Sequence, residues 1–201
     1  MKKEIKIFRD EDAIKAGLQS TRSDILSLLK LNDLTISQIV DSLGKEKSTI
    51  YRHIKKLEKH GYVKVKDEVY KRGAYEKIYT RTAKFFIMTP KSISSDKPTT
   101  VGEWDKKETK EVLKQLETIG FENDLSDELV EQLSKFFIDI GNDFTNRIQE
   151  NIGDIEEMNI LEFLRIKVMF LLLRMDNDDE LKERIERIRS EFKEKYDVKE
   201  E

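Results

Sequence analysis

Cysteine is absent from the 201-residue sequence, and histidine occurs only twice, as His53 and His60. Without cysteine there is no disulfide, no thiolate nucleophile and no Cys/His zinc site. The sequence also has no glycine-rich phosphate loop, and 41 Asp and Glu residues make chance carboxylate pairs too frequent to indicate a catalytic dyad. We therefore expect neither an enzyme nor a bound cofactor or metal.

Long apolar segments are also missing. The longest apolar run, residues 168–173, has six residues, which is far too short to cross a bilayer. Residues 1–7 are charged, and no apolar segment of the kind found in secretory signals follows them. These features predict a cytoplasmic protein with no membrane partner.

Charge is divided unequally along the chain. Residues 1–88 contain 20 Lys and Arg against 12 Asp and Glu, a net charge of +8, whereas residues 89–201 have a net charge of −11. Both prolines, Pro90 and Pro98, lie in a serine-containing segment just after this division. We predict a basic module at 1–88 that binds a polyanion, a linker at 89–103, and an acidic helical module at 104–201.

Residues 48–63 predict an amphipathic helix around which the basic module is organised. Ile50, Ile54 and Leu57 share one face at helical spacing. The opposite face is hydroxylated and basic, with Ser48, Arg52, Lys55 and Lys59. Taken alone, such a face is better explained by simple exposure to solvent than by a binding partner.

The flanking segments change that interpretation. Residues 35–38, T-I-S-Q, have the capping-box pattern that begins a short helix, and Gly44 is a suitable C-cap for it. Two earlier helices are expected, capped by Asp10 and Ser20. After the basic helix, residues 62–70 and 75–79 alternate like strands around a turn at 71–74. The order predicts a helix-turn-helix followed by a basic β-hairpin.

The segments T-I-S-Q-I-V-D-S-L-G and S-T-I-Y-R-H-I-K-K-L-E-K-H-G-Y-V, with a hairpin carrying R-G at its tip, resemble the winged-helix domain of ArsR-type bacterial and archaeal transcriptional regulators. The chain looks more like the archaeal members with long helical C-terminal extensions than like the metal-sensing members. The resemblance implies a homodimer that places one recognition helix per subunit in the major groove of double-stranded DNA. Metal-sensing members use cysteine ligands or Asp/His clusters on a late helix, and this chain has no cysteine.

DNA-contacting roles can be assigned along this segment. Arg52 has a planar fork that can pair with guanine, and Tyr51 can reach a thymine methyl or a phosphate. We expect the remaining contacts from the first turn of the recognition helix, its lysines, the preceding helix and the hairpin tip: Lys47, Ser48, Thr49, Lys55, Lys56, Ser37, Gln38, Lys71 and Arg72. Two alternatives stay open. In the first, Gln38 caps the helix and does not contact DNA. In the second, the hairpin tip is basic by chance and does not contact DNA either. His53, beside the apolar face, is expected to pack in the core.

The acidic half predicts four helices. The first spans about residues 104–119, the second is capped by Asp124 or Ser126, and the fourth is capped by Asp176 or Asn177. The third, residues 154–175, is apolar on most of its circumference, apart from Glu162, Arg165 and Lys167, which can face out. Such a helix favours a dimerisation bundle over an effector pocket.

We therefore predict a mainly α protein with a small β-hairpin, in which a winged helix-turn-helix domain precedes an α-helical dimerisation domain. The predicted function is sequence-specific regulation of transcription by a homodimer on an inverted repeat. A winged-helix protein-interaction module and an architectural DNA-binding module are the alternatives. The sequence leaves the operator, the sign of regulation and any small-molecule effector open.

Overall fold

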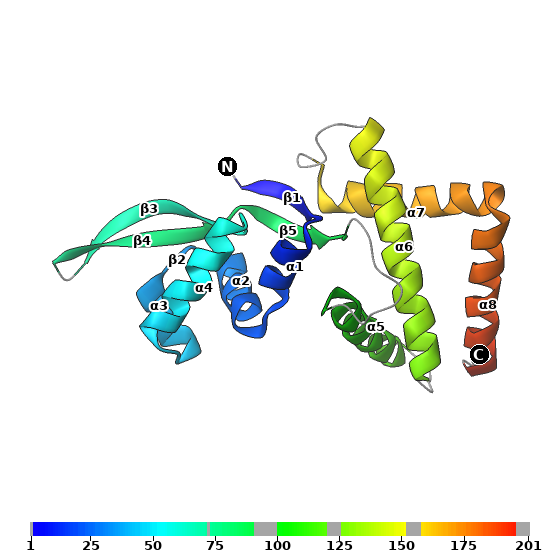
Figure 1. Ribbon diagram of the computed structural model, residues 1–201, viewed down its shortest axis with the longest axis horizontal. Helices are drawn as coiled ribbons and strands as arrows, with labels where there is room; N and C mark the ends of the chain where they lie inside the picture. The colour runs from blue at the N-terminus through cyan, green and yellow to red at the C-terminus, as the bar shows by residue number, and fades with distance from the viewer. Residues whose placement is uncertain (1, 72, 91–99, 120–125, 152–157, 196–201) are drawn as a thin grey trace. The chain divides into compact units, whose positions relative to one another are not determined.

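A computed structural model describes residues 2–71, 73–90, 100–119, 126–151 and 158–195. The chain forms two compact units, one of residues 1–91 with 154–160 and one of residues 92–153 with 161–201. The first unit contains four helices and five strands among its described residues (Figure 1): β1 Lys3–Phe8, α1 Glu11–Leu18, α2 Ser20–Leu31, β2 Leu34–Thr35, α3 Ile36–Leu43, α4 Lys47–Lys59, β3 Val63–Lys71, β4 Ala74–Arg81 and β5 Ala83–Met88.

Local capping sets the limits of the first helices. The Asp10 carboxylate accepts a hydrogen bond from the Ala13 amide at 2.8 Å, as the sequence predicts. The expectation that Ser20 caps α2 is wrong. Gln19 is the N-cap, and its side-chain oxygen accepts from the Arg22 amide at 3.1 Å, so Ser20 is the first residue of the helix.

The predicted hairpin is present and belongs to a three-stranded antiparallel sheet in the order β2-β4-β3. Its turn contains Gly73 at φ +84°, a conformation that glycine adopts at little cost. Figure 1 shows β3 and β4 extending beyond the helices of this unit, as a wing does. The two-residue strand β2 pairs with Tyr79 and Ile78 of β4, so the sheet holds the hairpin against the start of α3.

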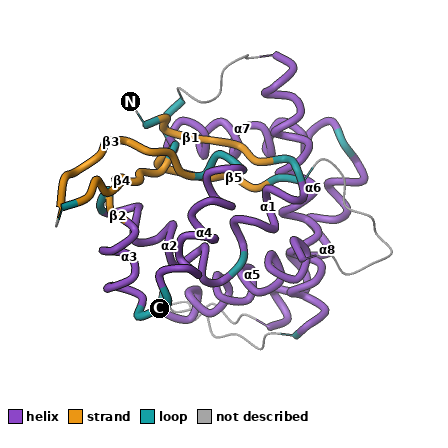
Figure 2. The backbone as a smooth tube through the Cα atoms, turned by 60° about the vertical axis from the view of Figure 1, so that its left-hand side comes forward, coloured by secondary structure: helices purple, strands orange, loops and turns teal. Residues whose placement is uncertain are grey.

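A second, parallel pair joins β1 to β5, two strands about eighty residues apart in the sequence (Figure 2). The pair positions an aromatic cluster against α1. The ring of Tyr62 stacks on Phe8 at 3.9 Å and meets Phe86 edge-on at 5.0 Å, and the Tyr62 hydroxyl donates to the Ala13 carbonyl at 3.0 Å. Tyr62 is fully buried, and burial raises the pKa of its hydroxyl.

The second unit consists of helices in its described part: α5 Thr100–Thr118, α6 Asp127–Asn151, α7 Ile160–Asn177 and α8 Asp179–Lys195. Its core lies between α5, α6 and α8 and contains Leu113, Leu129, Val130, Leu133, Phe136, Ile140, Leu181 and Ile188. α5 begins four residues earlier than expected. Ser126 caps α6 by accepting from the Leu129 amide at 3.2 Å, whereas the alternative cap, Asp124, lies outside the described residues.

The later helices differ from the prediction at their ends and in their orientation. α7 begins at Ile160, later than the predicted start at residue 154; residues 154–157 lie outside the described residues, and residues 158–159 are not helical. Asp176 and Asn177 do not cap α8, because α7 continues through both. Asp178 is the cap and accepts from the Leu181 amide at 3.0 Å.

Lys167, which the sequence leaves able to face out, turns inward instead. Lys167 is half-buried on the inner side of α7, where burial lowers its pKa and raises that of Asp105 on α5. Helix periodicity alone does not reveal which part of a nearly all-apolar circumference turns inward. No helix in the described part of the chain is long and apolar enough to cross a membrane.

Candidate nucleic-acid interface

Hydrogen bonds between residues close in the sequence define both ends of α3, the first helix of the helix-turn-helix. Thr35 and Gln38 form both hydrogen bonds of the capping box: the Gln38 side chain accepts from the Thr35 amide at 2.8 Å, and the Thr35 hydroxyl accepts from the Gln38 amide at 3.3 Å. Gly44 ends α3 at φ +61°, where its amide donates to the Val40 carbonyl at 2.9 Å. The chain then turns within two residues and enters α4.

α4 is fixed along its apolar side. Ile50, Ile54 and Leu57 are completely buried, as their spacing predicts. Because these three side chains fix the rotation of α4 about its axis, the residues on the other side of the helix are held facing solvent. The outer face of α4 is therefore set by the core of the unit.

Three predicted contact residues lie exposed on this outer face: Ser48, Arg52 and Lys56. Tyr51 is 50% exposed beside them, and Thr49 is partly buried. The Arg52 guanidinium makes one long hydrogen bond, to the Thr49 hydroxyl at 3.4 Å, and forms no ion pair within the described residues. It is thus free to meet an external acceptor with its fork.

Lys55 is placed differently from its neighbour Lys56. Its ammonium donates to the Glu58 carboxylate at 2.7 Å and lies 5.8 Å from the centre of the Tyr51 ring. The hydrogen bond to Glu58 raises the pKa of Lys55. Lys56 forms no ion pair within the part of the chain that the structure describes. Of these two predicted phosphate contacts, only Lys56 presents an uncompensated charge.

The N-terminus of α4 adds an anion-binding feature. Lys47 is the first residue of the helix, and the preceding Glu46 side chain makes no capping hydrogen bond. The first amide groups of a helix otherwise need an acceptor, and the helix dipole favours an anion there. Lys47 is exposed at this end, so cationic and amide donors lie together.

The two predicted contacts at the start of α3 already have partners. The Ser37 hydroxyl donates to the Glu76 carboxylate of β4 at 2.6 Å, which ties α3 to the hairpin. The Gln38 side-chain oxygen is used in the capping box. Each side chain keeps some hydrogen-bonding capacity, namely the hydroxyl oxygen of Ser37 and the amide NH₂ of Gln38.

At the wing, Lys71 is the last residue of β3 and pairs with Ala74, while Arg72 lies outside the described residues. Sequence reasoning missed a feature next to them. Tyr70 and Tyr75 form a cross-strand aromatic pair with ring centres 5.1 Å apart, and they are 63% and 73% exposed. The signal was available, because a turn at 71–74 places these two residues opposite each other.

A buried arginine behind α4 was also missed. Arg22 is 8% exposed, and its guanidinium donates to the carbonyls of Ala16 and Lys15. His53 lies half-buried against it, with Nδ1 3.4 Å from an Arg22 nitrogen. Burial lowers the pKa of His53, and the charge of Arg22 adds to this effect. The two side chains support the inner edge of α4.

Within the described residues, no group of three His, Asp or Glu side chains is arranged to hold a metal ion. The architecture defines a winged helix-turn-helix domain followed by helices. Residues 19–65 match the model of a family described as bacterial regulatory protein, arsR family, and this match indicates a DNA-binding domain of a transcriptional regulator.

Comparison with solved structures finds HlyU from Vibrio cholerae N16961, with 22% sequence identity and a TM-score of 0.30. The similarity covers 36% of this chain and 73% of that one. No curated protein matches the sequence.

Proposed function

We propose that this chain is a sequence-specific, double-stranded DNA-binding transcriptional regulator that acts as a homodimer on an inverted repeat. The observation that carries the proposal is the exposed outer face of α4, where Arg52 and Lys56 are held outward by a buried apolar side and form no ion pair within the described residues. The family match over residues 19–65 includes all of α4 and supports this assignment.

In this proposal α4 enters the major groove with its N-terminal half against the bases. Arg52 pairs with O6 and N7 of a guanine, and Tyr51 contacts a neighbouring thymine methyl or a phosphate. Ser48 and Thr49 lie one turn earlier, next to the amide groups of the helix N-terminus, which bind a phosphate together with Lys47.

The other contacts give affinity without choice of sequence. Lys56 meets a phosphate directly. Lys55 meets one only by releasing Glu58, so its contribution is smaller. Ser37 and Gln38 use their remaining hydrogen-bonding capacity toward the backbone, and Lys71 and Arg72 of the wing flank the minor groove.

A homodimer follows from the form of the proposed operator. Two copies of α4 related by a two-fold axis read two half-sites about 34 Å apart, which is one turn of the double helix. The acidic helices, α5 to α8, lie outside the segment that matches the family model. In this proposal they hold the two reading domains at that spacing.

Substitution of Arg52 by alanine tests the base-reading role. The duplex is first obtained by selection from a random pool, and binding of the Arg52→Ala protein is then compared on that duplex and on a scrambled duplex. Loss of a bidentate guanine contact costs about 1–3 kcal/mol per half-site on the selected duplex and little on the scrambled one.

The matched control is Lys56→Ala, which removes one cation from the same face and lowers affinity about equally on both duplexes. Equal losses for Arg52→Ala on the two duplexes would remove Arg52 from the base-reading role. That result would favour an architectural DNA-binding module instead.

A further inference from the structure

α7 carries an exposed apolar surface that its own unit leaves uncovered. Six large side chains, each between 49% and 64% exposed, lie on one side of the helix, and we call them the α7 ridge: Leu161, Leu164, Val168, Met169, Leu172 and Leu173. They extend over thirteen residues, about 18 Å along the helix axis. A contiguous apolar surface of this kind on a water-facing helix indicates an interaction site.

The outward position of the ridge is fixed by contacts on the opposite side of α7. Phe163 is 3% exposed, and its ring meets Phe144 of α6 at 5.2 Å. Phe170 also packs on Phe144, at 5.4 Å. Leu171 packs against the core of the unit. Because these side chains anchor one side of the helix, α7 cannot roll to bury its ridge within the unit.

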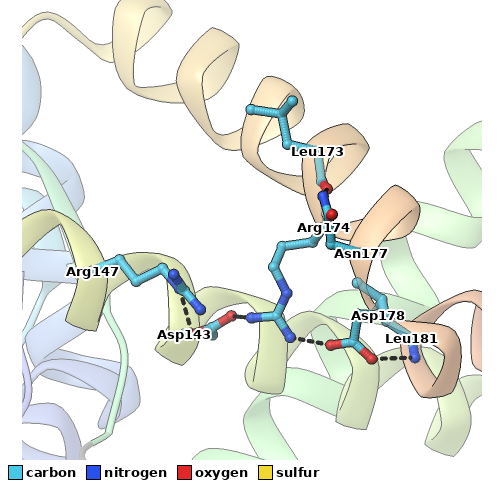
Figure 3. A network of polar contacts seen from close by, with 7 residues as sticks. All are labelled: Asp143, Arg147, Leu173, Arg174, Asn177, Asp178 and Leu181. Atoms are coloured by element: carbon cyan, nitrogen blue, oxygen red, sulfur yellow. Dashed lines mark hydrogen bonds and ion pairs between the residues drawn. The ribbon is translucent and has the colours of Figure 1, made fainter.

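Polar contacts fix the same orientation at the C-terminal end of α7 (Figure 3). Arg174 reaches from α7 to Asp143 on α6 and to Asp178, the residue that caps α8. Asp143 also accepts from Arg147 at 3.3 Å, so two arginines share one carboxylate. Asn177 donates to the Leu173 carbonyl at 2.9 Å and closes the end of the helix. The network joins three helices and leaves Leu173 at the outer edge.

Glu162, Arg165 and Asp176 lie exposed on the ridge side, and the latter two indicate what covers the ridge. Arg165 lies within the ridge and Asp176 lies just beyond its C-terminal end, and both are exposed. Neither forms an ion pair within the described residues. The two positions are eleven residues apart, about 16 Å along the axis, so they cannot reach each other on one helix.

We propose that the α7 ridge is the two-fold interface with a second copy of this chain, in which the two α7 helices pack antiparallel and Arg165 of each pairs with Asp176 of the other. An antiparallel arrangement forms two reciprocal ion pairs and places Val168 opposite Leu172 of the second copy. A parallel arrangement would set Arg165 against Arg165. In a two-fold interface the same surface of each subunit meets its own copy, so that surface must be complementary to itself. The ridge side of α7 meets this condition, because it carries both members of the ion pair. The apolar side chains provide the affinity, and the ion pairs choose the orientation.

This inference rests on the proposed homodimer. The mass of the protein in solution, measured by light scattering at micromolar concentration, tests the homodimer and the ridge interface separately. The unmodified protein is expected to have the mass of two chains, and Val168→Glu or Leu172→Glu that of one. The matched control is Val112→Glu on α5, which introduces the same charge at a 56% exposed position away from the ridge and stays dimeric. Unchanged far-ultraviolet circular dichroism verifies that the monomeric variants are folded.

Each outcome has a distinct meaning. An unmodified protein that is monomeric overturns both the homodimer and the ridge interface. A dimer that persists in both ridge variants overturns only the ridge, which then contacts another part of the chain or another protein. Loss of dimerisation in the two ridge variants alone supports the interface.

The orientation is tested by charge exchange and by cross-linking. Arg165→Asp and Asp176→Arg are each expected to weaken dimerisation about tenfold, and the double variant to restore it. Because the chain has no cysteine, Val168→Cys and Leu172→Cys proteins each carry a single thiol. After the two are mixed and oxidised, the antiparallel arrangement yields mainly the mixed disulfide, whereas a predominance of same-site disulfides overturns it.

Discussion

Two adjacent lysines of α4 should differ in how much they contribute to the salt dependence of DNA binding. Lys56 is exposed and forms no ion pair within the described residues, whereas the Lys55 ammonium donates to the Glu58 carboxylate at 2.7 Å. A lysine that meets a phosphate releases a condensed counterion from the DNA. A lysine already paired with a carboxylate releases less. The variants Lys55→Ala and Lys56→Ala are matched, because they remove the same side chain from neighbouring positions.

The expected size of the effect follows from the counterions that each variant no longer releases. Each lysine that meets a phosphate contributes about 0.9 to the slope of log K against log salt, so removing Lys56 from both subunits makes the slope shallower by about 1.8. When salt is raised from 50 to 200 mM, the affinity of both proteins falls. The factor by which it falls should be about 12 times smaller for Lys56→Ala than for the unmodified protein. Lys55→Ala should change the slope by less than half as much, and Glu58→Gln, which frees Lys55, should steepen it.

Fluorescence anisotropy with a labelled duplex, titrated at four or more salt concentrations, measures these slopes directly. Equal changes for Lys55→Ala and Lys56→Ala would contradict the distinction drawn from the Glu58 ion pair. An unchanged slope for Lys56→Ala would remove the outer face of α4 from the phosphate-binding surface.

Two further predictions concern stability of the first unit, measured by urea unfolding. A methyl group at Gly17 would lie 2.5 Å from the Tyr62 hydroxyl oxygen, and the Tyr62 ring cannot move away because it is buried against Phe8. Gly17→Ala should therefore lower the free energy of unfolding by about 1–3 kcal/mol. An unchanged unfolding midpoint would contradict this packing. Burial by itself would raise the pKa of Asp33, but hydrogen bonds from Lys66 at 2.6 Å and Lys2 at 3.0 Å hold that pKa well below its ordinary value. Since the folded-state pKa is depressed, the stabilisation is complete above about pH 5 and is lost as pH falls toward 2. Asp33→Asn should therefore lower stability at neutral pH and approach the unmodified protein in acid, whereas a pH-independent difference would refute the ion pairs.

Much of the reading domain could be predicted because its signals are local. The spacing of Ile50, Ile54 and Leu57 defines the buried side of α4 within three turns of helix. Thr35, Gln38 and Gly44 act through hydrogen bonds to residues three or four positions away. The turn at Gly73 likewise needs only its immediate neighbours to pair β3 with β4.

The features that escaped prediction depend on residues distant in the sequence. The pairing of β1 with β5 joins segments about eighty residues apart, and neither strand shows its partner in its own pattern. The bond from Ser37 to Glu76 spans 39 residues. The inward position of Lys167 depends on how α7 packs on its neighbours, because a helix that is apolar on nearly all sides has no preferred buried side of its own.

The central claim is that this chain reads an inverted repeat in double-stranded DNA, and selection of bound sequences from a random duplex pool tests it most directly. The protein is incubated with the pool at near-physiological salt, and the bound duplexes are recovered, amplified and sequenced over several rounds. The predicted result is a palindromic consensus with half-site centres about one helical turn apart and a guanine in each half-site that disappears with Arg52→Ala. Recovery of sequences no different from the starting pool would contradict the claim.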